Sequence, residues 1–201
     1  MPVGHRDAPV PLRMNDAKCS PEGILFAGSM FIEEYPEAKG ASALYRVEDS
    51  DIKLVLPGVT LSNGLGWSPD GSTMYYVDTR TQRIDKFDYS LQTGPINRRT
   101  FVEISESDGN PDGLCTDQEG GVWLALWGAS KVVRFSNSGQ QTEVVTLPTP
   151  HPTSVCFYGP HMNQLAITTA SMDTSATDTT SGSTFTIDAG VAGCVVATLK
   201  P

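Results

Sequence analysis

The chain has 201 residues, with 14 Lys+Arg against 23 Asp+Glu and a net charge of -9. This acidic balance argues against nucleic acid or an anionic membrane as a partner, because both need basic patches. Nineteen glycines, 14 prolines and only 18% charged residues favour a turn-rich chain over a bundle of solvent-facing helices.

The N-terminus and the cysteines help to predict the cellular compartment of the protein. Residues 1–7 contain no apolar run, so no signal peptide is visible, and no stretch is apolar enough for a membrane span. An even number of cysteines allows disulfides, but no two lie close enough for a CxxC pair, and two of them, Cys115 and Cys156, fall in apolar runs. We therefore expect a soluble, cytoplasmic protein with buried free thiols.

A repeat organises the chain from its first predicted strand onward. In each copy an Asn or Asp lies eight positions before a turn glycine, and the turn glycines are 48 and then 49 residues apart. The first and last residues of the three copies are Asn15 and Gly23, Asn63 and Gly71, and Asp112 and Gly120. Strand-like runs follow directly at 24–27, 74–77 and 122–125.

Each copy continues with two more strand-like segments. In chain order these are 43–47, 53–56, 84–89, 99–102, 131–135 and 143–147. A looser fourth unit contains 152–157, 165–169, 183–188 and 194–199, with a Ser/Thr-rich loop at 171–184 that we expect to be exposed and near a site. Four strands per unit of 40–50 residues is typical of a propeller blade. The prediction is one all-β propeller domain over residues 1–201, with about four blades.

The geometry of a propeller gives the repeat a chemical meaning. The first strand of each blade lines the central channel, so Asn15, Asn63 and Asp112 are expected to converge at the channel mouth. The alternative is that these residues only cap the turns before each strand, as Asn and Asp often do. The three polar residues lie within a repeat whose surrounding residues are similar in each copy, and this favours a binding site at the channel mouth.

At these residues the sequence resembles the regucalcin (senescence marker protein)–gluconolactonase–luciferin-regenerating enzyme family. The matching motifs keep the family's order between about residues 12 and 170. They are Arg13–Asp16, Phe26–Met30 with Glu33 and Glu34, Ser62–Ser68, Phe87–Tyr89, Gly94–Arg99, Pro111–Cys115, Arg134–Phe135, Leu147–Pro148 and Pro152–Ser154.

The resemblance implies a six-bladed propeller with one divalent cation at the channel mouth. Of the family's three metal ligands, the Asn and the Asp map onto Asn63 and Asp112. Its substrate contacts map onto Arg13, Asn15 and Glu33, with Glu34 as an alternative in register. Ca²⁺ is the first expectation for the cation, and Mg²⁺, Mn²⁺ and Zn²⁺ are the alternatives.

The sequence also departs from the family. Residues 1–12 match little, and the region that carries the family's N-terminal Glu ligand is absent. About ninety residues, close to two blades, are missing relative to the family. We therefore expect an N-terminally truncated form whose open blade edges favour self-association.

The function implied by the resemblance is metal-dependent hydrolysis of a sugar lactone. The cation would polarise the carbonyl, Asp112 would orient or deprotonate the attacking water, and Arg13, Asn15 and Glu33 would hold the sugar. The alternative is a non-catalytic calcium-binding or interaction propeller with an incomplete metal site.

Other catalytic readings find little support in the residues. There is no Gly-x-Ser-x-Gly elbow and no Walker loop. His5, His151 and His161 lie in loops outside the repeat frame, and no catalytic role is expected of them. The three tryptophans, Trp67, Trp123 and Trp127, are expected to pack between blades, with Trp127 near the mouth.

Overall fold

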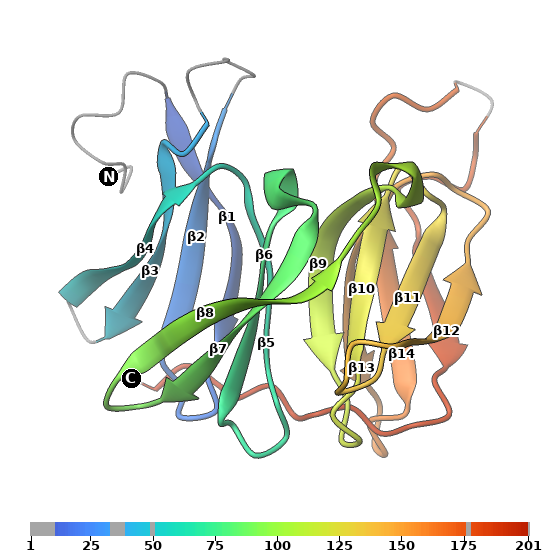
Figure 1. Cartoon of the computed structure of the whole chain (residues 1–201). Coiled ribbons are helices and arrows are strands. Elements are labelled where there is room, and N and C mark those ends of the chain that lie inside the picture. Colours follow the sequence, from blue (N-terminus) through green and yellow to red (C-terminus); the bar gives the residue numbers. More distant parts are fainter. Residues whose placement is uncertain (1–10, 33–38, 49–50, 176–177, 201) are drawn as a thin grey trace.

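The structure is a computed structural model, which describes residues 11–32, 39–48, 51–175 and 178–200 (Figure 1). Its described strands form four antiparallel sheets in which neighbours in sequence are neighbours in space. The first three sheets contain four strands each, and the last contains three. The all-β prediction and its division into four consecutive units are confirmed.

Within each sheet the strands follow one another in chain order. The first sheet contains β1 (Leu12–Cys19), β2 (Leu25–Phe31), β3 (Ser42–Glu48) and β4 (Asp51–Val59). The second contains β5 (Ser62–Trp67), β6 (Thr73–Asp78), β7 (Arg83–Ser90) and β8 (Gly94–Glu103). The third contains β9 (Asn110–Thr116), β10 (Val122–Trp127), β11 (Lys131–Phe135) and β12 (Gln141–Thr146). The last contains β13 (Pro152–Tyr158), β14 (Gln164–Thr169) and β15 (Thr184–Asp188).

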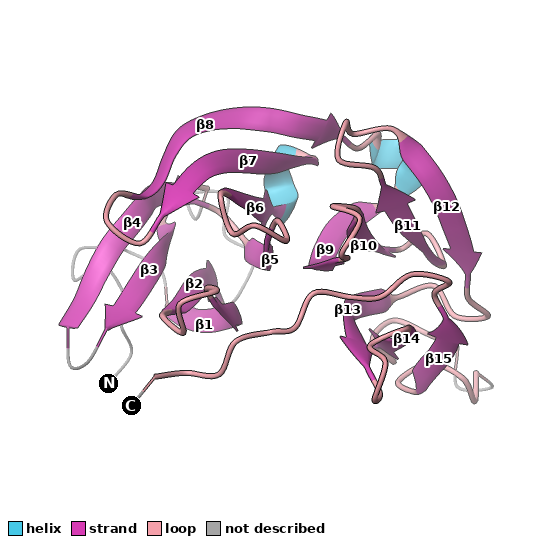
Figure 2. Ribbon diagram, turned by 90° about the horizontal axis from the view of Figure 1, so that it is seen from below, coloured by secondary structure: helices cyan, strands magenta, loops and turns pink. Residues whose placement is uncertain are grey.

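The four sheets are arranged as propeller blades along an arc (Figure 2). The first strand of each blade is innermost, and packing runs from β1 to β5, from β5 to β9 and from β9 to β13. Two short 3₁₀ helices, η2 (Thr79–Thr81) and η3 (Glu106–Asp108), follow β6 and β8, the second and fourth strands of the second blade. None of the described helices is long or apolar enough to cross a lipid bilayer.

The predicted final strand at 194–199 is wrong. This segment runs across the lower end of the molecule instead of pairing with β15 (Figure 2). The N–H of Cys194 donates to the carbonyl of Thr116 at 3.0 Å, and the N–H of Lys200 donates to the carbonyl of Gly23 at 3.0 Å. Its backbone is therefore held by inner-strand and turn residues of other blades.

Aromatic side chains fill the spaces between adjacent blades. Trp67 packs against Phe26 and Tyr89, with ring centroids 5.5 and 5.7 Å apart. Trp123, fully buried, packs edge-on against Phe157 at 6.0 Å. Both tryptophans have the packing role that the sequence predicts, and burying such large rings stabilises the blade interfaces.

Glycines bring the inner strands close together at the channel. A Cβ on Gly64 would lie 2.7 Å from the Asp112 carbonyl oxygen, and one on Gly113 would lie 2.6 Å from the Ser154 Cβ. Real Cβ atoms do not tolerate such distances, so only glycine permits this approach. The residues before these glycines, Asn63 and Asp112, are thereby brought to the same end of the channel.

Candidate functional site

A cavity of about 610 Å³ lies where the inner strands β1, β5 and β9 meet. Residues from all four blades and from the loop after β14 contribute to its wall. The wall includes Arg13, Asn15, Asn63, Thr79, Asp112, Trp127, Met172 and Asp173. The structure thus brings the three equivalent repeat residues together, as the propeller geometry predicts.

Two amides join the first blade to the second across this cavity. Asn15 Nδ2 donates to Asn63 Oδ1 at 2.8 Å and to the Ser62 carbonyl at 2.8 Å. Arg13 Nη1 donates in turn to Asn15 Oδ1 at 3.1 Å. A turn-capping role would leave these side chains bonded to their own turns, so the contacts between blades favour a shared site.

The Asn63 amide is held from its other side by Thr79. Asn63 Nδ2 donates to Thr79 Oγ1 at 2.7 Å, and Thr79 Oγ1 donates to the Pro111 carbonyl at 2.8 Å. Asn63 and Thr79 are both buried. Sequence reasoning missed Thr79 because it lies outside the repeat frame, and its only signal is its place just after the second strand of a blade.

Asp112 is half-buried and sits in a negative environment. Burial, the larger cause, and the charge of Asp16 together raise the pKa of its carboxyl group to about 8, against the opposing effect of a hydrogen bond from the Gly113 N–H. Burial also raises the pKa of Asp16, and Lys18 opposes that rise. Both shifts indicate that a positive charge placed nearby would stabilise the ionised carboxylates.

The remaining predicted residues divide into three groups. Glu33 and its alternative Glu34 lie in 33–38, outside the described residues. His5 also lies outside them. Trp127 lines the cavity, and its ring stacks on His151 with centroids 4.3 Å apart and planes inclined by 17°. The predicted loop does come near the site, because Met172 and Asp173 line the same cavity.

Comparisons with known proteins agree with this geometry. Residues 4–171 match the family described as "SMP-30/Gluconolactonase/LRE-like region". The chain belongs to this family. It is 38% identical to human regucalcin over 163 residues, which cover 79% of this chain and 54% of that protein.

Two solved structures share the fold of this chain. A luciferin-regenerating enzyme superposes with a TM-score of 0.85 at 30% identity, over 94% of this chain and 66% of that one. Regucalcin from Agrobacterium tumefaciens, described as a calcium-binding protein, superposes with a TM-score of 0.83 at 27% identity, over 94% and 64%. The chain spans about half the length of the curated relatives it matches.

The residues present fit the divalent cation that the SMP-30/gluconolactonase family implies. Asn63 Oδ1 and the Asp112 carboxylate are hard oxygen donors in one cavity, which suits Ca²⁺, Mg²⁺ or Mn²⁺. The raised pKa of Asp112 reflects a carboxylate that lacks a compensating positive charge, which a cation would supply. Within the described chain, no group of three or more His, Cys, Asp or Glu side chains is placed so that it could hold a metal.

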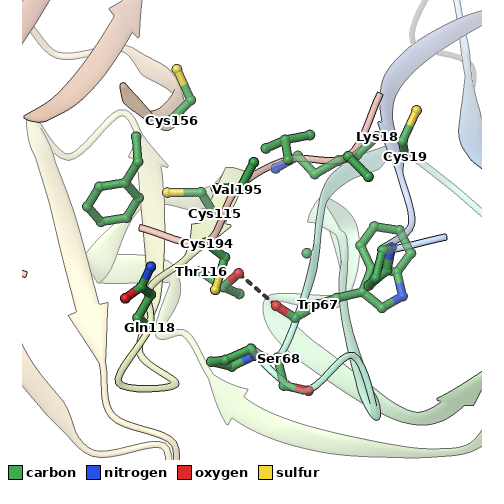
Figure 3. A pocket seen from close by; sticks show the side chains of 16 residues that line it. Lys18, Cys19, Trp67, Ser68, Cys115, Thr116, Gln118, Cys156, Cys194 and Val195 are labelled. Atoms are coloured by element: carbon green, nitrogen blue, oxygen red, sulfur yellow. Dashed lines mark hydrogen bonds between the residues drawn. The ribbon is translucent and has the colours of Figure 1, made fainter. Parts of the chain in front are cut away.

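A second cavity, of about 540 Å³, lies at the other end of the inner strands (Figure 3). All four cysteines line it: Cys19, Cys115, Cys156 and Cys194. All are free thiols, as predicted, but the predicted burial holds for Cys115 and is wrong for Cys156. Cys156 is exposed because β13 has no further inner strand packed beside it in the described chain and its side chain borders the open cavity.

Proposed function

We propose that this protein is a divalent-cation-dependent hydrolase of sugar lactones that acts at the 610 Å³ cavity. The observation that carries the proposal is the convergence of Arg13, Asn15, Asn63 and Asp112, from three blades, on one cavity. Membership of the SMP-30/gluconolactonase family supports this chemistry. The chain covers about half the length of its curated relatives, so we also propose that this chain alone catalyses the hydrolysis.

Asn63 Oδ1 and the Asp112 carboxylate would hold the cation. A divalent cation supplies Lewis-acid polarisation of the lactone carbonyl. The Asp112 carboxylate orients the attacking water and accepts its proton, and the inner strand β9 holds this side chain at the cavity. Ca²⁺ is the first candidate, and Mg²⁺, Mn²⁺ and Zn²⁺ follow.

Arg13 and Asn15 would bind the sugar. The guanidinium of Arg13 donates hydrogen bonds to ring hydroxyls, and its bond to Asn15 Oδ1 orients the two side chains together. Holding the ring in place lowers the entropic part of the barrier to attack. Glu33 would add an acceptor for hydroxyl groups, as the resemblance implies.

The test is hydrolysis of glucono-1,5-lactone, followed by acid release and corrected for spontaneous hydrolysis. The wild type is assayed with Ca²⁺, Mn²⁺, Mg²⁺ or Zn²⁺ and with EDTA, beside Asp112→Ala and the control Asp51→Ala. Asp51 is an exposed aspartate on β4, so the control makes the same charge change away from the cavity.

We expect EDTA and Asp112→Ala each to lower kcat/KM at least about 100-fold, the usual size for loss of a group that stabilises the transition state. Asp51→Ala should match the wild type. Equal rates in the wild type with metal, the wild type with EDTA, Asp112→Ala and Asp51→Ala would overturn the proposal.

A non-catalytic calcium-binding propeller is the second candidate. The observation in its favour is that the described residues contain no group of three or more His, Cys, Asp or Glu side chains that could hold a metal ion. Calcium binding by calorimetry without catalysed lactone hydrolysis would establish it.

We also propose a cytoplasmic location, since four free thiols suit a reducing compartment.

A further inference from the structure

Thr79 lies between the two cation-binding strands and is fixed there by its own backbone. It is the first residue of η2, and only 6% of it is exposed. Its N–H donates to the Leu61 carbonyl at 3.0 Å, which ties it to the residue before β5. Its hydroxyl group therefore has a defined position between β5 and β9.

The hydrogen bonds of this hydroxyl can run in only one direction. A carbonyl oxygen only accepts, so Thr79 Oγ1 must spend its single proton on the Pro111 carbonyl, 2.8 Å away. The same oxygen can then only accept from Asn63, at 2.7 Å. The Asn63 NH₂ group must therefore face Thr79.

The orientation of Asn63 follows from this contact. With Nδ2 on Thr79, Oδ1 points the other way, where it accepts from Asn15 at 2.8 Å beside the cavity. Asn15 supports the same orientation independently. Its NH₂ group must face the Ser62 carbonyl, which only accepts, so the atom of Asn63 beside that NH₂ group must be the acceptor Oδ1. The network thus determines which end of the Asn63 amide is available to a cation.

The second bond of Thr79 reaches the other cation-binding residue. Pro111 directly precedes Asp112, so the hydroxyl connects the Asn63 side chain to the backbone that carries the Asp112 carboxylate. These two residues come from different blades, and β5 and β9 are not neighbours in a common sheet. One hydroxyl therefore bridges the two blades that carry the oxygen donors.

We propose that Thr79 is a positioning residue, which orients the Asn63 amide oxygen and holds Asp112 at the distance that a divalent cation needs. The inference rests on the proposed cation site. Thr79→Val keeps the shape of the side chain and removes the hydroxyl, which leaves Asn63 Nδ2 and the Pro111 carbonyl without this partner. Thr79→Ser keeps the hydroxyl.

The experiment measures Ca²⁺ binding by calorimetry and lactone kcat/KM for the wild type and four variants. Thr79→Val and Thr79→Ala remove the hydroxyl in two sizes, so that one poorly folding variant does not decide the result. Thr79→Ser restores the hydroxyl. Thr81→Val is the matched control, because Thr81 lies in the same helix but donates to the Asp78 carbonyl at 2.8 Å. Circular dichroism establishes that each variant is folded.

We expect the two hydroxyl-free variants to weaken Ca²⁺ binding about 10- to 100-fold, the usual effect of losing a group that orients a metal ligand. Thr79→Ser and Thr81→Val should bind as the wild type does. Folded hydroxyl-free variants with wild-type affinity would overturn the inference, and so would a wild type that binds no Ca²⁺. Thr79-dependent Ca²⁺ binding without lactone hydrolysis would support the positioning role and reject the proposed activity.

Discussion

At the scale of single residues, the most constrained charge in the described chain is the Asp117 carboxylate. It is fully buried and accepts hydrogen bonds from Arg134 Nε at 2.8 Å and Trp123 Nε1 at 2.9 Å. It also accepts from the backbone N–H groups of Glu119 and Gly121. One side chain therefore satisfies the donors of a turn, an indole and a guanidinium that are themselves largely buried.

Replacing Asp117 by Ala should destabilise the fold strongly. The change leaves Arg134 Nε and Trp123 Nε1 without this acceptor, and breaking a buried pair in this way costs about 3–5 kcal/mol. Urea unfolding measures the free energy. The control is Asp88→Ala, which removes an exposed carboxylate 2.6 Å from Arg99 and should change stability little. Similar losses in the two variants would contradict the prediction.

Burial also sets the reactivity of the thiols. Burial raises the pKa of Cys115 to about 12, so its thiolate fraction falls about tenfold for each pH unit below that value. Because the thiolate is the nucleophile, we expect iodoacetamide at pH 8 to alkylate exposed Cys156 and to spare Cys115. Raising the pH to 10 should still leave Cys115 mostly unmodified.

Peptide mass spectrometry measures the alkylation of each cysteine. Protein unfolded in urea is the control, and there all four thiols should react. Labelling of Cys115 at the rate of Cys156 in folded protein at pH 8 would show that β9 opens readily.

At the scale of elements, the close approach of β5 and β9 depends on Gly64. A Cβ there would meet backbone atoms, the Asp112 oxygen at 2.7 Å and the Leu114 nitrogen at 2.8 Å, which cannot rotate away as a side chain would. Gly64→Ala should therefore separate the strands, cost about 1–3 kcal/mol, and weaken cation binding because Asn63 and Asp112 move apart.

Gly58→Ala is the control for this substitution. Gly58 has a φ of +73°, and its Cβ position is open, so alanine there adds backbone strain of about 1 kcal/mol without a clash. It should leave cation binding unchanged. Urea unfolding and calorimetry on both variants check the prediction, and unchanged Ca²⁺ affinity in Gly64→Ala would contradict it.

The same elements show what can be predicted from the sequence. The repeat is enough to predict the inner strands and the meeting of Asn15, Asn63 and Asp112, because equivalent positions in blades share one channel. Thr79 could not be predicted, because its contacts depend on the packing between blades. The segment 194–199 has the apolar composition of a strand, yet its backbone partners lie in other blades, and local composition does not specify such partners.

At the scale of the whole molecule, the last described sheet has three strands where the other three have four, so its third strand, β15, forms the outer edge of the blade. β15 pairs with β14, and the described residues place no strand on its other side. Phe185 and Ile187 of this strand pack partly against the core, while Thr184, Thr186 and Asp188 are exposed. An unpaired strand with one apolar face is a template for pairing with a second copy.

We therefore expect the protein to self-associate with increasing concentration, in sedimentation-velocity runs, through the edge of β15. Thr186→Lys places a charge at the middle of this strand, where pairing would bring two like charges from two copies close together, so the variant should remain monomeric at higher concentration. Gln92→Lys makes the same charge change in an exposed turn between β7 and β8 and controls for net charge. Association that is equally strong in all three proteins would place the contact elsewhere, whereas loss in both lysine variants would attribute it to overall charge. Because the proposed cation ligands Asn63 and Asp112 lie on β5 and β9, in other blades than β15, Ca²⁺ affinity should be the same in the monomer and in the associated form.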